Sequence, residues 1–187
     1  MKLTQGGFKI LREELFKTLD QKQVDALNFI VEGCDSYKVS YPEAAYILAT
    51  IFHETGIVVE GKLYRSMQPV KERGSDAYLK SKKYYPYIGY GYVQLTWEPN
   101  YKRVGGLIGV DLIKHPEKAL EPDIALKIAI EGMLKGWFTG VGFQRKRPVS
   151  KYNKAQYTSA RAIINGTDKA ADIANYAMVF EKALRSY

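Results

Sequence analysis

The sequence predicts a mainly α-helical domain with two lobes and an irregular central segment. Apolar residues recur at helical spacing through much of the chain, and helix-capping residues precede some of these stretches. Residues 57–96 lack that spacing. A chain of 187 residues with 46% apolar residues has the usual size of one domain and can bury a core without disulfides. We therefore treat residues 1–187 as a single domain.

The N-terminal part is expected to hold three helices. Residues 8–18 and 21–34 carry apolar side chains three and four positions apart. The third helix begins after Ser40, which can cap it, and Glu43 can complete a capping box. It is strongly apolar, and we expect it to stop at Gly56 because glycine commonly terminates helices.

The middle of the chain is different in composition. Residues 57–96 are rich in glycine, lysine and tyrosine, and they predict a long functional loop with a short hairpin around 84–96. Helical spacing then resumes in four stretches. They are residues 98–108, 122–137, 155–164 and 168–186, the last after a cap at Thr167 or Asp168.

Cysteine and histidine are scarce. Cys34 is the only cysteine and lies among apolar helical residues, so we interpret it as a small core residue. His53 and His115 are the only histidines, which excludes a structural zinc site built from Cys and His ligands. No motif points to a cofactor or to an oligomer, and we expect a monomer.

The chain is basic, with a net charge of +8, which favours anionic partners of any kind. Residues 1–10 lack the apolar run of a signal peptide, and no segment has the roughly 18 apolar residues that span a membrane. These features predict a protein made and kept in a reducing cytosol unless another protein releases it.

Glu54 is the strongest candidate for a catalytic acid. It ends the apolar third helix, where the helix dipole is negative and Ile51 and Phe52 are neighbours. Both effects disfavour a carboxylate, so we expect a raised pKa, which suits a group that protonates a glycosidic oxygen. The alternative is a solvated glutamate at an ordinary helix end. We interpret the adjacent His53 as structural, bonded to backbone or to a loop carboxylate.

Glu72 is the candidate for a second carboxylate. It lies between Lys71 and Arg73, which favour its ionised form and so suit a base that activates water. A triplet of this kind is also common on wet surfaces. Glu60 is the other candidate for this role, six residues after Glu54. A protonated and an ionised carboxyl together are the pair that glycoside hydrolysis uses.

Gln94 and Thr96 stand two apart in a stretch that alternates like a strand, so both are expected on one face. There they could hold a water molecule or an acetamido group. Val93, Leu95 and Trp97 would face the core. The alternative is an edge strand with an ordinary polar face.

Tyrosines crowd the segment before this stretch. Tyrosine has an apolar face and a polar tip, which match a sugar ring, although such rings also stack on nucleobases or simply pack. The five tyrosines of residues 84–92 are Tyr84, Tyr85, Tyr87, Tyr90 and Tyr92.

A basic run without acidic residues occupies 145–154. It is either a solvated loop or a patch that docks on an anionic envelope. The patch would comprise Arg145, Lys146, Arg147, Lys151 and Lys154.

Taken together, these stretches resemble glycoside hydrolase family 19, which includes plant-type chitinases and bacteriophage endolysins. The similarity spans about residues 45–180 in the family's order and is strongest to muramidase-type endolysins of Acinetobacter phages. The matching segments are 53–56, 71–74, 89–97 with Asn100 and Tyr101, 108–112 and 162–166.

The resemblance implies a lysozyme-like helical fold with a sugar-binding cleft between two lobes and a small irregular or hairpin region beside it. It implies Glu54 as general acid and Glu72 as general base of an inverting mechanism. Thr96, where chitinases usually have serine, would help to position the water. The implied substrate-binding residues are Gln94, Tyr85, Tyr90, Asn100 and Asn165.

Two departures from the family pattern matter. The family's Tyr-Tyr-Gly-Arg-Gly is stretched to residues 84–91 here, with a tyrosine in place of the arginine. This favours a substrate other than plain chitin. The chitinases' disulfides are absent, which agrees with a cytosolic origin.

The leading interpretation is an endolysin that cuts peptidoglycan between N-acetylmuramic acid and N-acetylglucosamine. It would accumulate in the cytoplasm of a bacterial host, reach the wall through a separate holin, and bind the anionic envelope rather than nucleic acid. A chitinase with the same residues is the second interpretation. The third is a wall- or nucleic-acid-binding module without catalysis, which would not need the set Glu54, Glu72, Gln94 and Thr96.

Overall fold

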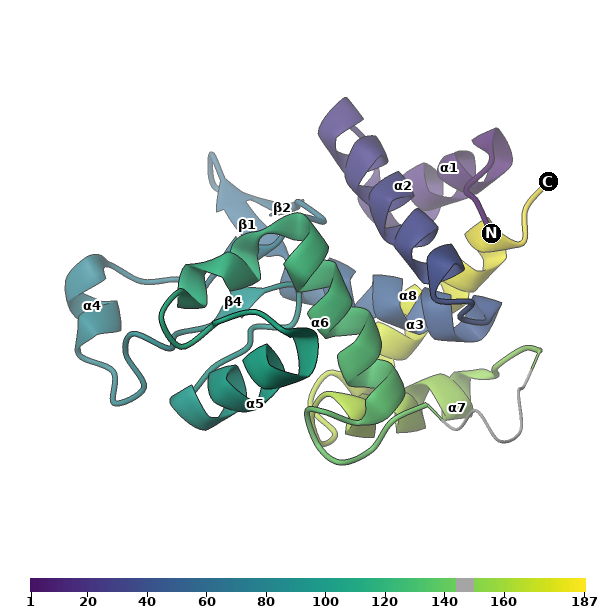
Figure 1. The fold of residues 1–187 in the computed structure, drawn as a ribbon. Coiled ribbons are helices and arrows are strands. Elements are labelled where there is room, and N and C mark those ends of the chain that lie inside the picture. The colour runs from purple at the N-terminus through teal and green to yellow at the C-terminus, as the bar shows by residue number, and fades with distance from the viewer. Residues whose placement is uncertain (144–149) are drawn as a thin grey trace.

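The computed structural model describes residues 1–143 and 150–187 and shows a two-lobed, mainly helical protein (Figure 1). One lobe holds both chain termini. The other is built from the segment between α3 and α6, and the long helix α6 (Pro122–Lys135) runs between them. The mainly α fold class predicted from the sequence is therefore confirmed.

The first lobe is organised around α3 (Tyr41–Glu54). Its capping box forms as predicted: Ser40 Oγ accepts from the Glu43 N–H at 3.4 Å, and Glu43 accepts from the Ser40 N–H at 2.7 Å. Residues 44–51 are completely buried, which is expected of a helix that is apolar all round. The surrounding elements are α1 (Gln5–Leu11), a π-helical turn (Arg12–Phe16), α2 (Gln21–Ser36), α7 (Lys154–Ser159), a 3-10 turn (Ala160–Ile163) and α8 (Ala170–Leu184).

Aromatic contacts join α3 to α8. The Phe52 ring meets Tyr176 at 4.9 Å and Phe180 at 5.9 Å, both edge-on. Cys34 is fully buried in the same core, and burial raises the pKa of its thiol to about 12. The interpretation of Cys34 as a core residue is confirmed.

The second lobe has its own small core. This core is formed by Leu95, Tyr101, Val104, Ile108, Leu112, Ala119, Ile128 and Trp137. Because α6 contributes Ile128 here and Ala129 to the first core, it forms a shared wall that keeps the lobes in a defined relation. The elements are β1 (Gly56–Val59), β2 (Lys62–Arg65), β3 (Val70–Lys71), α4 (Asp76–Lys80), β4 (Tyr90–Gly91), α5 (Glu98–Ile108) and a 3-10 turn (Pro116–Leu120).

Two short antiparallel sheets organise the central segment. β1 pairs with β2 in a hairpin that the sequence did not predict. β3 pairs with β4, with Val70 opposite Gly91 and Lys71 opposite Tyr90. The second pairing brings the Glu72 segment beside the tyrosine-rich segment, although the paired residues lie 19 and 21 positions apart in the chain.

Three local expectations were wrong. Residues 93–97 form no strand: Gln94 and Trp97 adopt positive φ values of 54° and 75°, so the chain turns instead. Trp97, expected in the core, is 49% exposed. The cap of α8 is Lys169, without a side-chain hydrogen bond, rather than Thr167 or Asp168.

Candidate active site

In the structure α3 ends at Glu54, two residues before the expected stop at Gly56. Its end is not formed by a glycine. Gly56 begins β1 and does not act as a left-handed terminator. Instead the Thr55 hydroxyl donates to the Ile51 carbonyl at 2.7 Å, and Arg65 Nη1 donates to the Phe52 and His53 carbonyls at 3.1 and 2.8 Å. A guanidinium on the last carbonyls is a favourable helix end because it meets the negative pole of the helix dipole.

Glu54 lies in a half-buried position at this helix end. Its side chain is 25% exposed, and Oε1 lies 3.9 Å from Nη2 of Arg161. Burial raises the pKa of Glu54 above its ordinary value, and Asp168 adds to the rise. The positive charges of Arg161 and Arg65 act in the opposite direction. The net rise agrees with the expectation from the sequence and suits a group that must still carry a proton when it meets substrate.

A pocket of about 350 Å³ opens beside Glu54, where the end of α3 meets the two small sheets. Apolar side chains and cations share its wall. The lining residues are His53, Glu54, Gly56, Ile57, Leu63, Arg65, Val70, Lys71, Arg73 and Gln94. Three of these carry positive charge against the single carboxyl of Glu54, so the pocket favours an anionic ligand.

His53 was interpreted from the sequence as a structural residue, but the structure places it in the pocket wall. Its Nδ1 is buried and makes no hydrogen bond to any described residue. Burial lowers the pKa of His53, and the charges of Arg65 and Arg161 lower it further. The imidazole is therefore neutral at neutral pH and can serve as a hydrogen-bonding group towards a ligand.

Glu72 is held firmly beneath the tyrosine-rich segment. Its Oε1 accepts from the Tyr84 hydroxyl at 2.7 Å and its Oε2 from the Gly89 N–H at 2.9 Å. The bond to Glu72 raises the pKa of Tyr84 to about 12, so Tyr84 stays a donor. Lys71 and Arg73, the chain neighbours of Glu72, line the pocket. Glu72 itself is not among the described residues that line it. Its role as general base stays a prediction.

Glu60, the other candidate for the second carboxylate, sits in the turn of the β1–β2 hairpin. It is exposed and has a φ of 49°. Glu60 is not among the described residues that line the pocket. Its position disfavours it relative to Glu72.

Among the described residues, Gln94 lines the pocket and Thr96 does not. The left-handed turn at Gln94 directs its Nε2 to the Val70 carbonyl, to which it donates at 2.8 Å. Thr96 Oγ1 donates to the Gln94 carbonyl at 2.9 Å, and Asn100 Nδ2 donates to the Thr96 carbonyl at 2.9 Å. Thr96 and Asn100 therefore shape the turn that presents Gln94.

The five tyrosines divide between surface and core. Tyr85 is 44% exposed, while Tyr92 is fully buried. Tyr84 lies edge-on to Trp97 with ring centroids 5.0 Å apart, and Tyr90 is half-buried above the second core. Tyr85 and Trp97 are thus the exposed aromatic residues of this segment, while Tyr84, Tyr87 and Tyr90 are half-buried.

Asn165 is exposed, and its Oδ1 accepts from the Gly166 N–H at 2.7 Å. Arg161, which was not among the residues expected from the sequence, lies beside Glu54 in this segment. A signal was present, because Tyr157, Arg161 and Ile164 share one helical face and a cation there is unusual.

The structure describes only part of the predicted basic patch. Lys151 and Lys154 are exposed, as a docking surface requires. Arg145, Lys146 and Arg147 lie outside the described residues.

Within residues 1–143 and 150–187, every helix falls short of the length and apolar character that a membrane crossing needs. Across those ranges no three His, Cys, Asp or Glu side chains gather so that they could hold a metal ion.

The pH dependence of stability should report the environment of Glu54. Its folded-state pKa is raised, so the stability it contributes is complete below the unfolded pKa of about 4.3 and is lost as pH rises through the folded-state pKa. Glu54→Gln removes that loss. The Tm of this variant relative to the wild type should therefore increase with pH when thermal melts are compared from acid to neutral conditions. Glu60→Gln, at an exposed site, should show no such trend; a constant Tm difference for Glu54→Gln would contradict the assignment.

Comparisons with known proteins bear on the fold. No family model matches the chain, and no curated protein matches its sequence. The solved structures that are similar to this chain include three of chitinases. A variant of chitinase C aligns over 96% of this chain and 92% of its own, with a TM-score of 0.60 and 20% identity. Chitinase C from Streptomyces griseus aligns over 94% and 75%, with a TM-score of 0.56 and 20% identity.

The third structure is a bacterial family 19 chitinase, which aligns over 99% of this chain and 96% of its own, with a TM-score of 0.53 and 17% identity. At such identities the similarity shows the fold alone. The fold is that of the bacterial family 19 chitinases, as the resemblance in sequence motifs implied.

Proposed function

From a family 19 chitinase-like fold with a half-buried carboxyl in its pocket, we propose that this protein is a glycoside hydrolase that cuts peptidoglycan between N-acetylmuramic acid and N-acetylglucosamine. The observation that carries the proposal is Glu54: a half-buried carboxyl with a raised pKa at the edge of an open pocket. A buried group of this kind is what general-acid cleavage of a glycosidic bond requires.

In the proposed reaction Glu54 donates its proton to the glycosidic oxygen as the bond to the sugar's anomeric carbon breaks. A water molecule activated by Glu72 attacks that carbon from the opposite face, and the configuration inverts. Inverting enzymes keep the two carboxyls roughly 6.5–9.5 Å apart to leave room for the water. Gln94, held by the Val70 carbonyl, is placed in the pocket wall to bind the substrate.

The charge of the pocket favours peptidoglycan over chitin. Arg65, Lys71 and Arg73 line it with only one carboxyl, and the whole chain carries a net charge of +8. Peptidoglycan bears carboxylates on its peptide branches, whereas chitin is uncharged. Cations around the cleft attract the anionic polymer and increase its local concentration.

This activity fits an endolysin that lyses a bacterial host from within. In this proposal the protein accumulates in the host cytoplasm and reaches the wall through a separate holin. The exposed Lys151 and Lys154 would add to its attraction for the anionic envelope.

A chitinase is the second candidate, because the three solved structures reported above are chitinases. Both candidates use the same acid and differ in the sugar polymer. The choice between them therefore needs a measurement of products.

The test is mass spectrometry of borohydride-reduced fragments released from purified Gram-negative peptidoglycan, with chitin oligosaccharides digested in parallel. We expect fragments that end in reduced muramic acid and little cleavage of chitin. Reduced glucosamine ends would move the cleavage site to the other bond, and anhydro ends would indicate a transglycosylase. Release from chitin alone would favour the second candidate. A protein that pellets with the wall but releases nothing would be a binding module.

A further inference from the structure

Arg161 is a buried cation next to the proposed acid. It lies in the 3-10 turn after α7, and its side chain is only 3% exposed. Nε donates to the Asp168 carbonyl at 2.8 Å, which fixes one end of the guanidinium. Nη2 lies 3.9 Å from Glu54 Oε1. A buried arginine is costly unless it is paired, so its place beside Glu54 calls for a reason.

The remaining nitrogen, Nη1, belongs to a buried polar cluster. It is buried and makes no hydrogen bond to any side chain or carbonyl of the described residues. Tyr46, Thr50 and Glu54 follow one another at intervals of four on α3, so they lie along one face of the helix. The Tyr46 hydroxyl and Thr50 Oγ1 are fully enclosed, and hydrogen bonding from the Thr50 and Arg161 side chains acts on Tyr46. The charge of Arg161 acts on Tyr46 as well as on Glu54.

We propose that Arg161 is a positioning residue for Glu54, which it orients towards the pocket from a buried polar cluster with Tyr46 and Thr50. This inference rests on the proposed function. The pairing with Oε1 is longer than a direct hydrogen bond, so it restrains the carboxyl without binding it tightly. When Glu54 gives its proton to the leaving oxygen, it becomes a carboxylate in a half-buried site. The fixed guanidinium stabilises that developing charge.

Other charged groups also act on Glu54, and together with Arg161 they determine whether its pKa rises or falls. Arg65 from β2 attracts the carboxylate, and Asp168, before α8, repels it, while His53 beside it is neutral. Burial raises the pKa of Glu54, and Arg161 is the largest influence that lowers it. Removing the guanidinium should therefore move the titration of Glu54 to higher pH and weaken the stabilisation of its ionised form.

The experiment compares Arg161→Met and Arg161→Lys with the wild type. For Arg161→Met we expect kcat on peptidoglycan to fall by about tenfold or more with KM changed by less than about twofold, because ground-state binding of the glycan does not use this residue. The alkaline limb of the kcat–pH profile should move to higher pH. Arg161→Lys keeps the positive charge but not the planar geometry of the guanidinium. The alkaline limb of its kcat–pH profile should therefore stay near that of the wild type, while kcat is partly lost.

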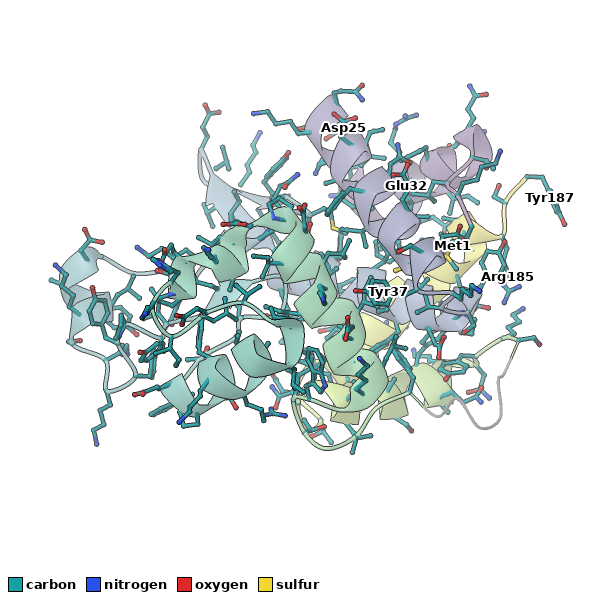
Figure 2. All side chains as sticks on the ribbon, viewed as in Figure 1. Met1, Asp25, Glu32, Tyr37, Arg185 and Tyr187 are labelled. Carbon is teal, nitrogen blue, oxygen red and sulfur yellow. The ribbon has the colours of Figure 1, made fainter. Side chains whose placement is uncertain are left out.

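Arg185→Met is the matched control. Arg185, labelled near the C-terminus in Figure 2, also pairs with a glutamate, Glu181, at 2.7 Å and stacks on Tyr41. Its loss should lower Tm without moving the pH profile. If Arg161→Met behaves in the same way, Arg161 is a structural residue and the inference is overturned. If Arg161→Met is too unstable to purify, Arg161→Lys decides: kcat within about twofold of the wild type overturns the inference.

A second readout separates this inference from the proposed function. In protein labelled with ¹³C at glutamate carboxyls, the Glu54 signal is assigned by its loss in Glu54→Gln. Its titration midpoint should move to higher pH in Arg161→Met, whether or not any glycan is cut. An inactive wild type with this shift would refute the proposed function but support the control of Glu54 by Arg161. If the wild type is active but the Glu54 titration is unchanged in Arg161→Met, the proposed function is supported and the control of Glu54 by Arg161 is refuted.

Discussion

Glu54→Gln is expected to lower the rate of peptidoglycan cleavage by about 10³-fold or more while the protein stays folded. Glutamine has nearly the same shape but cannot give a proton to the leaving oxygen. The site is half-buried beside a pocket, so solvent cannot easily replace that proton. The loss should appear in kcat, because the variant keeps the pocket that binds the glycan. The measurement is the initial rate of release of soluble fragments from dye-labelled peptidoglycan.

The matched control is Glu60→Gln. Glu60 lies six residues further along the same segment but is exposed in the hairpin turn. It should retain activity within about twofold of the wild type. Circular dichroism melts of both variants would show that neither has lost its fold. A Glu54→Gln enzyme with more than about a tenth of wild-type activity would remove Glu54 from the role of acid.

Glu72→Gln should have the second-largest effect, a loss of about 10²-fold to 10⁴-fold if Glu72 activates the attacking water. The carboxylate also anchors two partners, Tyr84 and the Gly89 N–H. A loss of activity could therefore come from chemistry or from a displaced tyrosine segment, and the variant alone does not separate these causes.

Tyr84→Phe separates them. It removes the donor to Glu72 Oε1 but keeps the carboxylate and the bond from Gly89. We expect a loss of less than about tenfold, typical of one hydrogen bond at the edge of a site. Equal losses in Tyr84→Phe and Glu72→Gln would mean that Glu72 serves as an anchor and that the base lies elsewhere. The rates would be measured at saturating peptidoglycan to exclude effects on binding.

The helices were the most predictable part of the fold. α5 spans the predicted residues 98–108, and α3 begins at the predicted capping box. The central segment was much less predictable, because its strands are two to four residues long and their pairing depends on partners elsewhere in the chain. The strand-like alternation at 93–97 was misleading, since it follows from a turn that buries Leu95 and presents Gln94.

Within the candidate site, the residues found from sequence were those with a local signal. Glu54 could be predicted because helix ending and apolar neighbours are properties of adjacent residues. The contacts of Arg65 and Arg161 near Glu54 could not be predicted, because the fold creates them. The face that Arg161 shares with Tyr157 and Ile164 signals a buried cation but not its neighbour Glu54.

The chain's own pattern of caps and apolar spacing was thus sufficient to determine a mainly helical domain and an acidic residue at the end of its most buried helix. Those features depend on interactions over one or two helical turns. The charge balance around Glu54, the inward position of His53 and the anchoring of Glu72 came only with the folded arrangement. Burial and electrostatic attraction depend on distances in space, and segments far apart in sequence supply them.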